Sequence, residues 1–425
     1  MKKVMLKTTL SLAVAMASSH VFASGFALNE QDVAGMGTGF AGRSSSADNA
    51  STVYGNPAGM ARLEGQQITG GVAAIDASTD IKDGRGTARG TNKGDMVPFT
   101  AVPFGFYTNK LNDQWAIGFG VYAPFGLVTD YENGFQGRGF GSYSKVSVIT
   151  LQPTVSYAFN DRVSIGFGPT INRISGKLES ELSLNPAAQD TNITIKGDDT
   201  AVGFNVGVLV QATDTTRVGL TYHSKVSYKL EGHTEVSAPA ATSPFLGSGR
   251  YDASLKIDTP ESWDASVTQD LSDAWKVYGG ATWTRWSRLK DITVNNDGVT
   301  TANGRLAPTI VGQISEPQNW HDTWAYAIGT SYQVTKQVVL RTGLTWDQSP
   351  TNNTDRSPRI PTGDRTIFSL GLGYAVMDNM TIDLAYSYLK EEPVKVNKSN
   401  QLGSNYSAKY ENSANGFGLG VTYKF

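Results

Sequence analysis

The last nine residues of the chain read Phe417-Gly418-Leu419-Gly420-Val421-Thr422-Tyr423-Lys424-Phe425. Every second residue is apolar or aromatic, and the residues between them are glycine, threonine and lysine. A period of two places alternate side chains on opposite faces of an extended chain, so this stretch predicts a β-strand with one apolar face. The same alternation recurs from residue 66 onward, for example in 115–122, 149–159 and 368–376. We therefore expect an all-β protein.

Fourteen such strands can be marked along the chain, and their connections alternate between short and long. The strands are expected near 66–80, 98–109, 114–123, 145–159, 162–180, 200–212, 216–230, 250–270, 274–290, 320–334, 337–347, 364–376, 380–390 and 414–425. The long polar connections are expected at 81–97, 124–144, 181–199, 231–249, 291–319, 348–363 and 391–413. An even number of antiparallel strands, joined alternately by tight turns and long loops, is typical of a transmembrane β-barrel of a bacterial outer membrane. Both ends of the barrel then lie at the periplasmic side.

The composition agrees with this architecture and excludes several others. Charged residues make up only 17% of the chain, whereas glycine occurs 46 times and aromatic residues reach 10%. The net charge of −2 gives no reason to expect a nucleic-acid partner, and the absence of cysteine excludes disulfides and thiolate metal sites. A soluble β-sandwich is the main alternative, but its core would have to be packed from the small, glycine-rich faces of the strands. Trp115, Trp275 and Phe425 lie beside turns or the chain end, where an aromatic girdle belongs.

Residues 1–23 have the pattern of a secretory signal peptide. Lys2, Lys3 and Lys7 precede a short apolar stretch, and Val21-Phe22-Ala23 offers small residues for cleavage. The apolar stretch is too short for a membrane anchor, which is the alternative. An exported chain has no access to intracellular cofactors, so we expect none.

Residues 24–65 interrupt the alternation. This segment is rich in glycine and suits short helices and turns. Irregular backbone cannot face lipid, because its N–H and C=O groups would lack partners, whereas a fourteen-stranded barrel has room for a small plug. We expect a hatch at 24–65 inside a barrel formed by 66–425. The sequence Gly37-Thr38-Gly39-Phe40-Ala41-Gly42 satisfies a dinucleotide-binding pattern, but no strand precedes it, so we do not interpret it that way.

Several short stretches carry a resemblance to a known family. They are Ser24-Gly25-Phe26-Ala27-Leu28-Asn29-Glu30, Asn56-Pro57-Ala58, Asp347-Gln348-Ser349-Pro350, Ile360-Pro361 and Asp364-Arg365. The chain resembles the FadL-type long-chain fatty acid transporters over the whole segment that follows the signal peptide. The resemblance implies a monomeric barrel that carries hydrophobic molecules, with long-chain fatty acids as the expected substrate, passively across the outer membrane. Its partners would be that substrate and the surrounding membrane lipid and lipopolysaccharide.

The resemblance also implies a route. The substrate would pass from the extracellular loops to a pocket at the hatch and leave sideways through a kink in the third strand. The hatch residues that would bind it are Ser24, Gly25, Phe26, Leu28, Asn56, Pro57 and Ala58. The residues themselves support a lateral opening, because Pro103, Pro124, Pro153 and Pro169 fall in or beside strands two to five, and proline donates no ladder hydrogen bond. We place the opening at Tyr122, Ala123, Pro124, Phe125 and Gly126. The alternative is that Pro124 only starts a loop.

The head group of the substrate is less well defined. The resemblance implies a cation that meets the carboxylate, but Ser180 stands where an arginine would be expected, and the stretch before the tenth strand carries Glu316 and His321. Arg173 and Lys177 are possible carboxylate contacts, although both lie on the outward phase of the alternation. Neutral or aromatic hydrocarbons therefore stay an alternative class of substrate, and a general aqueous porin is an alternative function.

Catalytic or metal-binding constellations are not evident. After the signal peptide the chain contains the histidines His223, His233 and His321, and no nucleophile motif accompanies them. The acidic residues Asp95, Asp198 and Asp199 lie in separate predicted loops. We predict neither an enzyme nor a metal protein.

Overall fold

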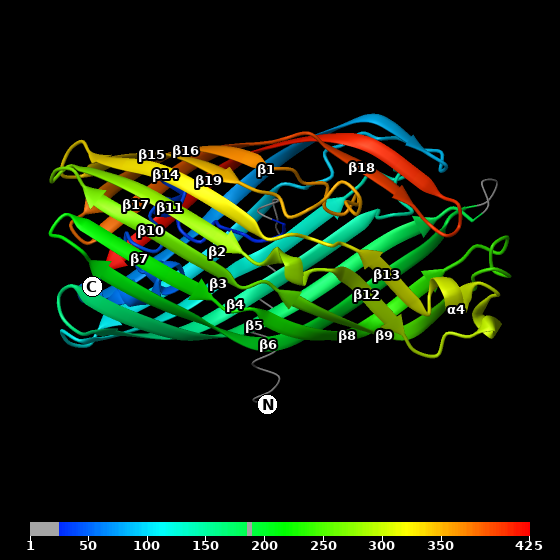
Figure 1. Ribbon diagram of the computed structural model, residues 1–425, viewed down its shortest axis with the longest axis horizontal. Helices are drawn as coiled ribbons and strands as arrows, with labels where there is room; N and C mark the ends of the chain where they lie inside the picture. Colours follow the sequence, from blue (N-terminus) through cyan, green and yellow to red (C-terminus); the bar gives the residue numbers. More distant parts are fainter. Residues whose placement is uncertain (1–24, 185–188) are drawn as a thin grey trace.

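A closed β-barrel forms the wall of the protein (Figure 1). The computed structural model describes residues 25–184 and 189–425, so the predicted signal peptide 1–23 and Ser24 lie outside the described residues. The first strand, β1 (Gln66–Gly86), pairs antiparallel with β2 (Thr100–Lys110) on one side and with the last strand, β19 (Asn405–Lys424), on the other. Because the sheet closes on itself, it has no free edge along most of its length.

The remaining wall segments follow one another in antiparallel order. They are β3 (Trp115–Asp130), β4 (Tyr143–Ala158), β5 (Val163–Leu182), β6 (Thr191–Gln211), β7 (Thr216–His223), β8 (Val226–Ser237), β9 (Gly249–Thr259), β10 (Ser262–Asp270), β11 (Trp275–Thr284), β12 (Asp291–Asn296), β13 (Gln313–Pro317), β14 (Thr323–Gln333), β15 (Val338–Asp347), β16 (Arg365–Met377), β17 (Met380–Glu391) and β18 (Val394–Ser399). Interruptions divide five crossings into the pairs β7/β8, β9/β10, β11/β12, β13/β14 and β17/β18. The described segments therefore make fourteen crossings, and the predicted fourteen-stranded barrel is confirmed.

The strands extend further on the long-loop side than the sequence predicts. Residues 191–199, expected in a loop, belong to β6, and much of 391–413 forms β18 and the start of β19. The expected loop 291–319 contains β12 and β13. In these extensions the apolar residues, such as Ile193 and Val396, face inward and the outward residues are polar, because lipid does not select an apolar outer face at their level. A search for strands with an apolar outer face therefore ends too early.

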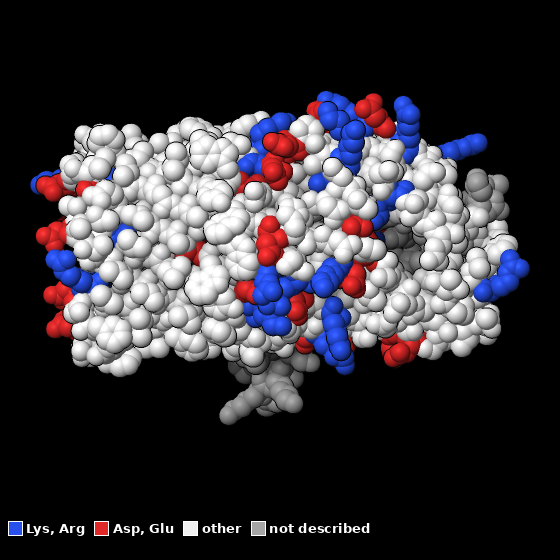
Figure 2. Space-filling view, in the orientation of Figure 1, with Lys and Arg blue, Asp and Glu red and all other residues white. Residues whose placement is uncertain are grey.

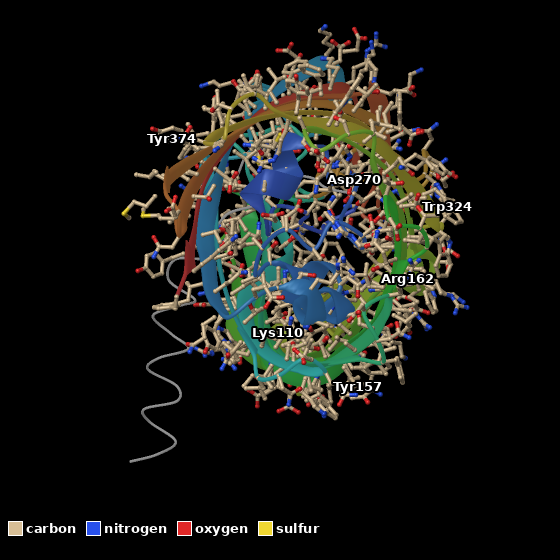
Figure 3. The ribbon with its side chains drawn as sticks, turned by 90° about the vertical axis from the view of Figure 1, so that its left-hand side faces the viewer. Lys110, Tyr157, Arg162, Asp270, Trp324 and Tyr374 are labelled. Atoms are coloured by element: carbon tan, nitrogen blue, oxygen red, sulfur yellow. The ribbon has the colours of Figure 1, made fainter. Side chains whose placement is uncertain are left out.

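The outward face of the barrel is apolar at the level of the predicted membrane. On β5, exposed Ile165, Phe167 and Ile171 alternate with buried residues that point inward. Figure 2 shows a broad zone almost free of charged side chains between a charged rim at the turn end and a charged region beyond the middle of the barrel. Tyr157, Trp324 and Tyr374 lie outside the ring of strands (Figure 3). Such a belt matches a barrel embedded in lipid.

Helices are short in this protein. The extracellular region contains η2 (Trp286–Arg288), η3 (Thr301–Asn303) and α4 (Ala307–Ile310). In the described part of the chain, helices of the length and apolarity required for crossing a membrane do not occur.

The N-terminal segment lies inside the barrel (Figure 3). Its helical pieces are α2 (Val33–Gly37), α3 (Thr52–Gly55) and η1 (Pro57–Arg62). α2 packs against β16, β17 and β19, whereas η1 packs against β4, β5 and β6, so the segment spans the lumen. Glycine makes this packing possible, since a Cβ atom on Gly371 would lie 2.8 Å from the Cα atom of Gly37. The small inward faces of the strands thus leave the space that the hatch fills.

Candidate transport site

The start of the hatch takes the place of a missing strand contact beside β3. The ladder between β2 and β3 ends at the pair Gly105 and Val121, although both strands continue. Beyond that point, the N–H of Gly126 donates to the oxygen of Phe26 (2.7 Å), and the N–H of Leu28 donates to the oxygen of Pro124 (2.8 Å). The wall therefore has a gap between β2 and β3, and the hatch residues 26–28 line its β3 edge.

A bulge in β3 accompanies this gap. The register between β3 and β4 shifts between Tyr122 and Phe125, so one additional residue of β3 is accommodated there. β3 nevertheless continues to Asp130, and the alternative that Pro124 only starts a loop is therefore wrong. Pro103 lies on β2 in the part that has no β3 partner. Its lack of an N–H therefore removes no hydrogen bond to β3.

The other two prolines mark a second interruption of the ladder. Paired residues of β4 and β5 are Leu151 with Ile171 and then Val155 with Phe167, so the register places Pro153 opposite Pro169. Both side chains are exposed on the outward face. All four prolines thus lie beside unpaired stretches of wall, as their lack of an N–H requires.

Small and aliphatic side chains fill the β2–β3 gap from the inside. Leu28, Val102 and Ala123 form a buried cluster there. The amide nitrogen of Gln31 donates to the oxygens of Ala123 (2.7 Å) and Leu28 (3.0 Å), which holds the hatch start against β3. The residues predicted from the hatch start and from strand three are therefore brought into direct contact.

A large apolar cavity lies on the extracellular side of the hatch. Inward aliphatic side chains such as Leu127, Ile174 and Leu255 line it. Phe26 also lines it and packs with Trp286 and Trp320, with ring centroids 4.9 and 6.0 Å away. Gly25 has a positive φ of 64°, and a Cβ atom there would lie 2.6 Å from the Trp320 ring. A glycine is therefore required for Phe26 to reach the aromatic cluster.

Arg359 is a buried cation in the wall of this cavity. Its side chain is 9% exposed, and its Nε donates to Oε2 of Glu316 across 3.1 Å. Its Nη1 donates to the Ser144 hydroxyl (2.9 Å), and its Nη2 donates to the Ser180 hydroxyl (2.7 Å). Ser180, where the resemblance would put an arginine, thus binds an arginine from another part of the chain.

Arg359 belongs to the connection between β15 and β16, which folds back into the barrel. The Tyr131 hydroxyl donates to the oxygen of Pro358 (2.7 Å), and the Asn412 side chain donates to the oxygen of Pro361 (2.8 Å). Sequence reasoning missed Arg359 because strand periodicity gives no direction for a side chain in an irregular segment. The neighbouring Ile360-Pro361, already noticed for its resemblance, was the signal that could have pointed to it.

The two predicted carboxylate contacts lie elsewhere. Nη2 of Arg173 is 2.7 Å from Oδ2 of Asp198, and Nζ of Lys177 is 2.6 Å from Oε1 of Glu179. Both side chains are on the outward face of β5, as their phase predicts, and neither belongs to the lining of the apolar cavity.

Asn56, Pro57 and Ala58 fasten the hatch to the wall. The Asn56 side chain accepts a hydrogen bond from the Ala58 N–H (3.0 Å) and donates to the oxygen of Val208 (2.9 Å). The Ser164 hydroxyl donates to the oxygen of Ala58 (2.9 Å). These residues hold η1 against β5 and β6 and do not line the apolar cavity.

A second, more polar cavity connects the hatch with the gap. Leu28, Arg43, Tyr122 and Phe125 are among its lining residues. The Arg43 guanidinium donates to the Asn29 side chain (2.9 Å) and lies 4.9 Å from the centroid of the Phe40 ring. Phe26 of the apolar cavity packs against Phe125 of the second cavity, with ring centroids 5.7 Å apart, so the two cavities adjoin beside the β2–β3 gap.

The histidines do not form a common site. His223 also lines the second cavity, and its ring lies 4.9 Å from that of Tyr54. His233 lies on β8, where its Nδ1 is 3.2 Å from Nη2 of Arg250. Within residues 25–184 and 189–425, no cluster of three potential metal-ligating side chains is found.

A closed fourteen-stranded barrel with a plugged lumen and an apolar internal cavity defines an outer-membrane transport protein for hydrophobic compounds. Residues 14–425 match the family model described as "Outer membrane protein transport protein (OMPP1/FadL/TodX)", and the chain belongs to this family. The resemblance seen in the sequence is thereby confirmed, as is the outer-membrane location.

Individual relatives extend over the full length of the chain. The long-chain fatty acid transport protein of Escherichia coli O6:H1 is 27% identical, and the match covers 100% of this chain and 99% of that protein. The crystal structure of a Pseudomonas aeruginosa FadL homologue is 27% identical, with a TM-score of 0.83 over 94% of this chain and all of that one. The Ralstonia pickettii toluene transporter TbuX is 18% identical with a TM-score of 0.67 over 90% of this chain and 95% of that one, which shows a shared fold.

Proposed function

We propose that the protein mediates passive uptake of long-chain fatty acids through the apolar cavity, past Phe26 and out through the β2–β3 gap into the membrane. The observation that carries this proposal is the contact of the cavity-lining Phe26 with β3 at the edge of the gap. Transfer of a fatty acid with fifteen methylene or methyl groups from apolar surroundings into water would cost about 12 kcal/mol of free energy, at about 0.8 kcal/mol per group. A route that stays within apolar surroundings avoids most of this penalty.

Opening the gap requires only a small rearrangement. The hydrogen bonds that join Phe26, Leu28 and Gln31 to β3 must break, and each contributes about 0.5–1.5 kcal/mol net. Leu28 must also leave its contact with Val102 and Ala123. A passing alkyl chain would replace the apolar contacts that Leu28 loses. The barrel acts as a monomer in this proposal, with the surrounding lipid and lipopolysaccharide as its partners.

The head group is recognised by Arg359 rather than by Arg173 or Lys177. Arg359 lines the apolar cavity, whereas the two predicted cations point outward. An arginine suits a carboxylate because its planar fork donates two parallel hydrogen bonds. The substrate carboxylate would take the place of the Glu316 side chain beside the guanidinium.

Uptake of neutral or aromatic hydrocarbons is the second candidate. The Arg359–Glu316 ion pair favours it, because the two charges already compensate each other and the rest of the lining is mainly aliphatic. A general aqueous porin fits less well, since α2 and η1 lie against opposite sides of the wall and occupy the lumen between them.

A reversible lock can test the route. Ala27 and Phe125 form an isolated antiparallel bridge, and the native chain has no cysteine. In the Ala27→Cys/Phe125→Cys variant, a disulfide would fix the hatch start to β3. We expect uptake of a fatty acid into proteoliposomes to stop in the oxidised variant and to return on reduction. The control is Ala77→Cys/Ala414→Cys, which joins paired residues of the continuous β1–β19 ladder. Equal uptake by the oxidised and reduced forms of the Ala27/Phe125 variant would refute the lateral route.

A further inference from the structure

Three lysines form a row across neighbouring strands. Lys145 on β4 is directly opposite Lys177 on β5, and Lys177 is directly opposite Lys196 on β6. Directly opposed residues of an antiparallel sheet point to the same side. Strands lie about 4.8 Å apart, so the outer two lysines of the row start about 10 Å from each other. Three equal charges at such spacing repel one another, which is unfavourable unless an anion compensates them.

The row faces outward. The residues next to it in sequence, such as Ser144, Gly176 and Leu178, line the apolar cavity inside the barrel. Because successive side chains of a strand alternate between the two faces, the lysine side chains point away from the lumen. Lys145 and Lys177 therefore lie outside the proposed transport route, whereas Lys196 points outward by strand phase but also contributes to the lining of the apolar cavity.

The row also lies above the apolar belt on the extracellular side. Lys177 follows Ile171, an exposed apolar residue of β5, by six positions, and Lys196 precedes the exposed Val202 of β6 by six positions. At about 3.3 Å per residue and a strand tilt of about 40°, six residues rise about 15 Å along the barrel axis. Charged side chains are frequent beyond the charge-poor zone in Figure 2. This level corresponds to the head groups of the outer leaflet.

The protein itself compensates only part of this charge. Nζ of Lys177 is 2.6 Å from Oε1 of Glu179 and 4.7 Å from the centroid of the Tyr143 ring. Two of the neighbouring carboxylates already have other partners, since Asp198 pairs with Arg173 (2.7 Å) and Glu231 pairs with Lys229 (3.0 Å). Among the residues that the structure describes, Lys145 and Lys196 take part in no ion pair. Lys145 and Lys196, which flank Lys177, can therefore both bind an external anion.

We propose that Lys145, Lys177 and Lys196 bind the phosphate groups of lipopolysaccharide in the outer leaflet. An ammonium group is a compact charge that donates strong hydrogen bonds to phosphate oxygens, and a row of three matches a head group that carries more than one phosphate. Such a contact would fix the rotational position of the barrel relative to its lipid neighbours. The inference rests on the proposed lipopolysaccharide partnership, and it is independent of which compound is transported.

A charge-matched pair of variants tests the site. The row variant is Lys145→Gln/Lys177→Gln/Lys196→Gln, and the control is Lys276→Gln/Lys336→Gln/Lys424→Gln at the turn end of the barrel. Purified full-length protein in detergent is titrated with lipopolysaccharide, and the bound fraction is measured by native mass spectrometry. We expect the row variant to bind roughly tenfold or more weakly, since each surface lysine contributes to the attraction of an anionic lipid. The control should bind as the native protein does.

Two further arms identify the source of the phosphate and the integrity of the variant. Dephosphorylated lipopolysaccharide should bind the native protein as weakly as intact lipopolysaccharide binds the row variant. Phosphatidylglycerol should not compete at equal concentration, because it has a single phosphate. Equal binding by the row variant and the control, or equal competition by phosphatidylglycerol, would overturn the proposal. Fatty acid uptake into proteoliposomes that lack lipopolysaccharide should be unchanged in the Lys145→Gln/Lys177→Gln variant, because neither position lines the apolar cavity, and this separates the site from the transport route.

Discussion

The N–H of Leu28 donates a hydrogen bond to the oxygen of Pro124 across 2.8 Å, which joins the hatch to the bulged strand of the wall. Pro124 cannot donate to a neighbouring strand, yet its oxygen remains available, and the hatch uses it. The kink and the plug are therefore one structural unit. A change on either side of this bond should therefore alter the gap.

Restoring a regular strand at the gap should slow transport. Deletion of Ala123 combined with Pro103→Val and Pro124→Val removes the bulge and gives β2 and β3 the donors they lack. We expect fatty acid uptake into proteoliposomes to fall roughly tenfold or more, since one or two added hydrogen bonds would have to break during each passage. Binding in the apolar cavity should persist.

The matched control for this change is Pro153→Val/Pro169→Val, which regularises the other interrupted ladder. That variant should transport at the native rate. A similar loss of uptake in both variants would mean that the effect comes from general stiffening of the wall.

Removal of the Arg359 charge should separate carboxylates from neutral ligands. In the Arg359→Gln/Glu316→Gln variant, both members of the ion pair become neutral, so no charge is left buried without a partner. If Arg359 recognises a carboxylate, the Kd of a long-chain fatty acid should rise roughly tenfold to a hundredfold, because a hydrogen bond to a charged group contributes about 1.5–3 kcal/mol. Tryptophan fluorescence can report binding, since Trp286 and Trp320 lie beside Phe26.

The alcohol of the same chain length is the reference ligand, and its affinity should stay the same. Arg173→Gln serves as the control variant, because this arginine faces outward. If the fatty acid and the alcohol respond equally to the double substitution, the cavity selects for the hydrocarbon chain alone, and the neutral-hydrocarbon candidate gains support.

A methyl group at Gly207 should loosen the hatch. A Cβ atom there would lie 1.9 Å from Oδ1 of Asn56. This Oδ1 accepts the hydrogen bond of the Ala58 N–H at the start of η1, and Nδ2 of the same side chain donates to the oxygen of Val208. Gly207→Ala should destabilise the packed hatch by about 1–3 kcal/mol, as overpacking usually does. The measurement is ion conductance in a planar bilayer, which should increase.

Gly279→Ala is a suitable control, because an added Cβ atom would contact nothing within 4 Å. It should leave the conductance at the native level. Unchanged conductance in Gly207→Ala would show that η1 tolerates a shift away from the wall without opening a water path.

Acidification should tighten the hatch through Glu30. Burial raises the pKa of the Glu30 carboxyl, and the nearby Arg43 and Arg365 only partly oppose this shift. A carboxyl with a raised pKa in the folded state binds a proton more readily there than in the unfolded state. Stability is therefore greatest below the ordinary pKa of a glutamate and is lost as the pH rises through the raised value.

Hydrogen exchange of the Leu28 amide reports this effect, because that amide is bonded to the wall. Exchange, corrected for its intrinsic pH dependence, should slow as the pH falls from neutral. Glu30→Gln should remove this trend. A trend of the same size in the variant would assign it to another group.

The membrane-spanning strands can be predicted from the sequence because each one needs an apolar residue at every second position, on the face that contacts lipid. Alternation along residues such as Ile165, Phe167 and Ile171 is set by the membrane, and it predicts each crossing. Above the membrane this rule ends, so the strand at 191–199 was expected to be a loop. The extended chain there is paired with β5 and β8, and these partners cannot be identified from a local pattern.

The site was predictable where the backbone chemistry is local. A proline in a strand demands an unpaired neighbour, so Pro124 pointed to the gap from sequence alone. Arg359 could not be found this way, because its partners Ser144, Ser180 and Glu316 come from distant parts of the chain. Their meeting depends on how the connection between β15 and β16 folds back, and strand periodicity contains no information about that.

The placement of α2 sets an order of assembly. This helix near the start of the chain rests on β16, β17 and β19, which are among the last segments to be synthesised. Contacts between such distant parts of a chain form slowly, because a long loop must close before any of them contributes. The hatch can thus reach its final position only when these last strands have joined the barrel. A nascent protein halted before that moment would leave its apolar interior exposed to the periplasm.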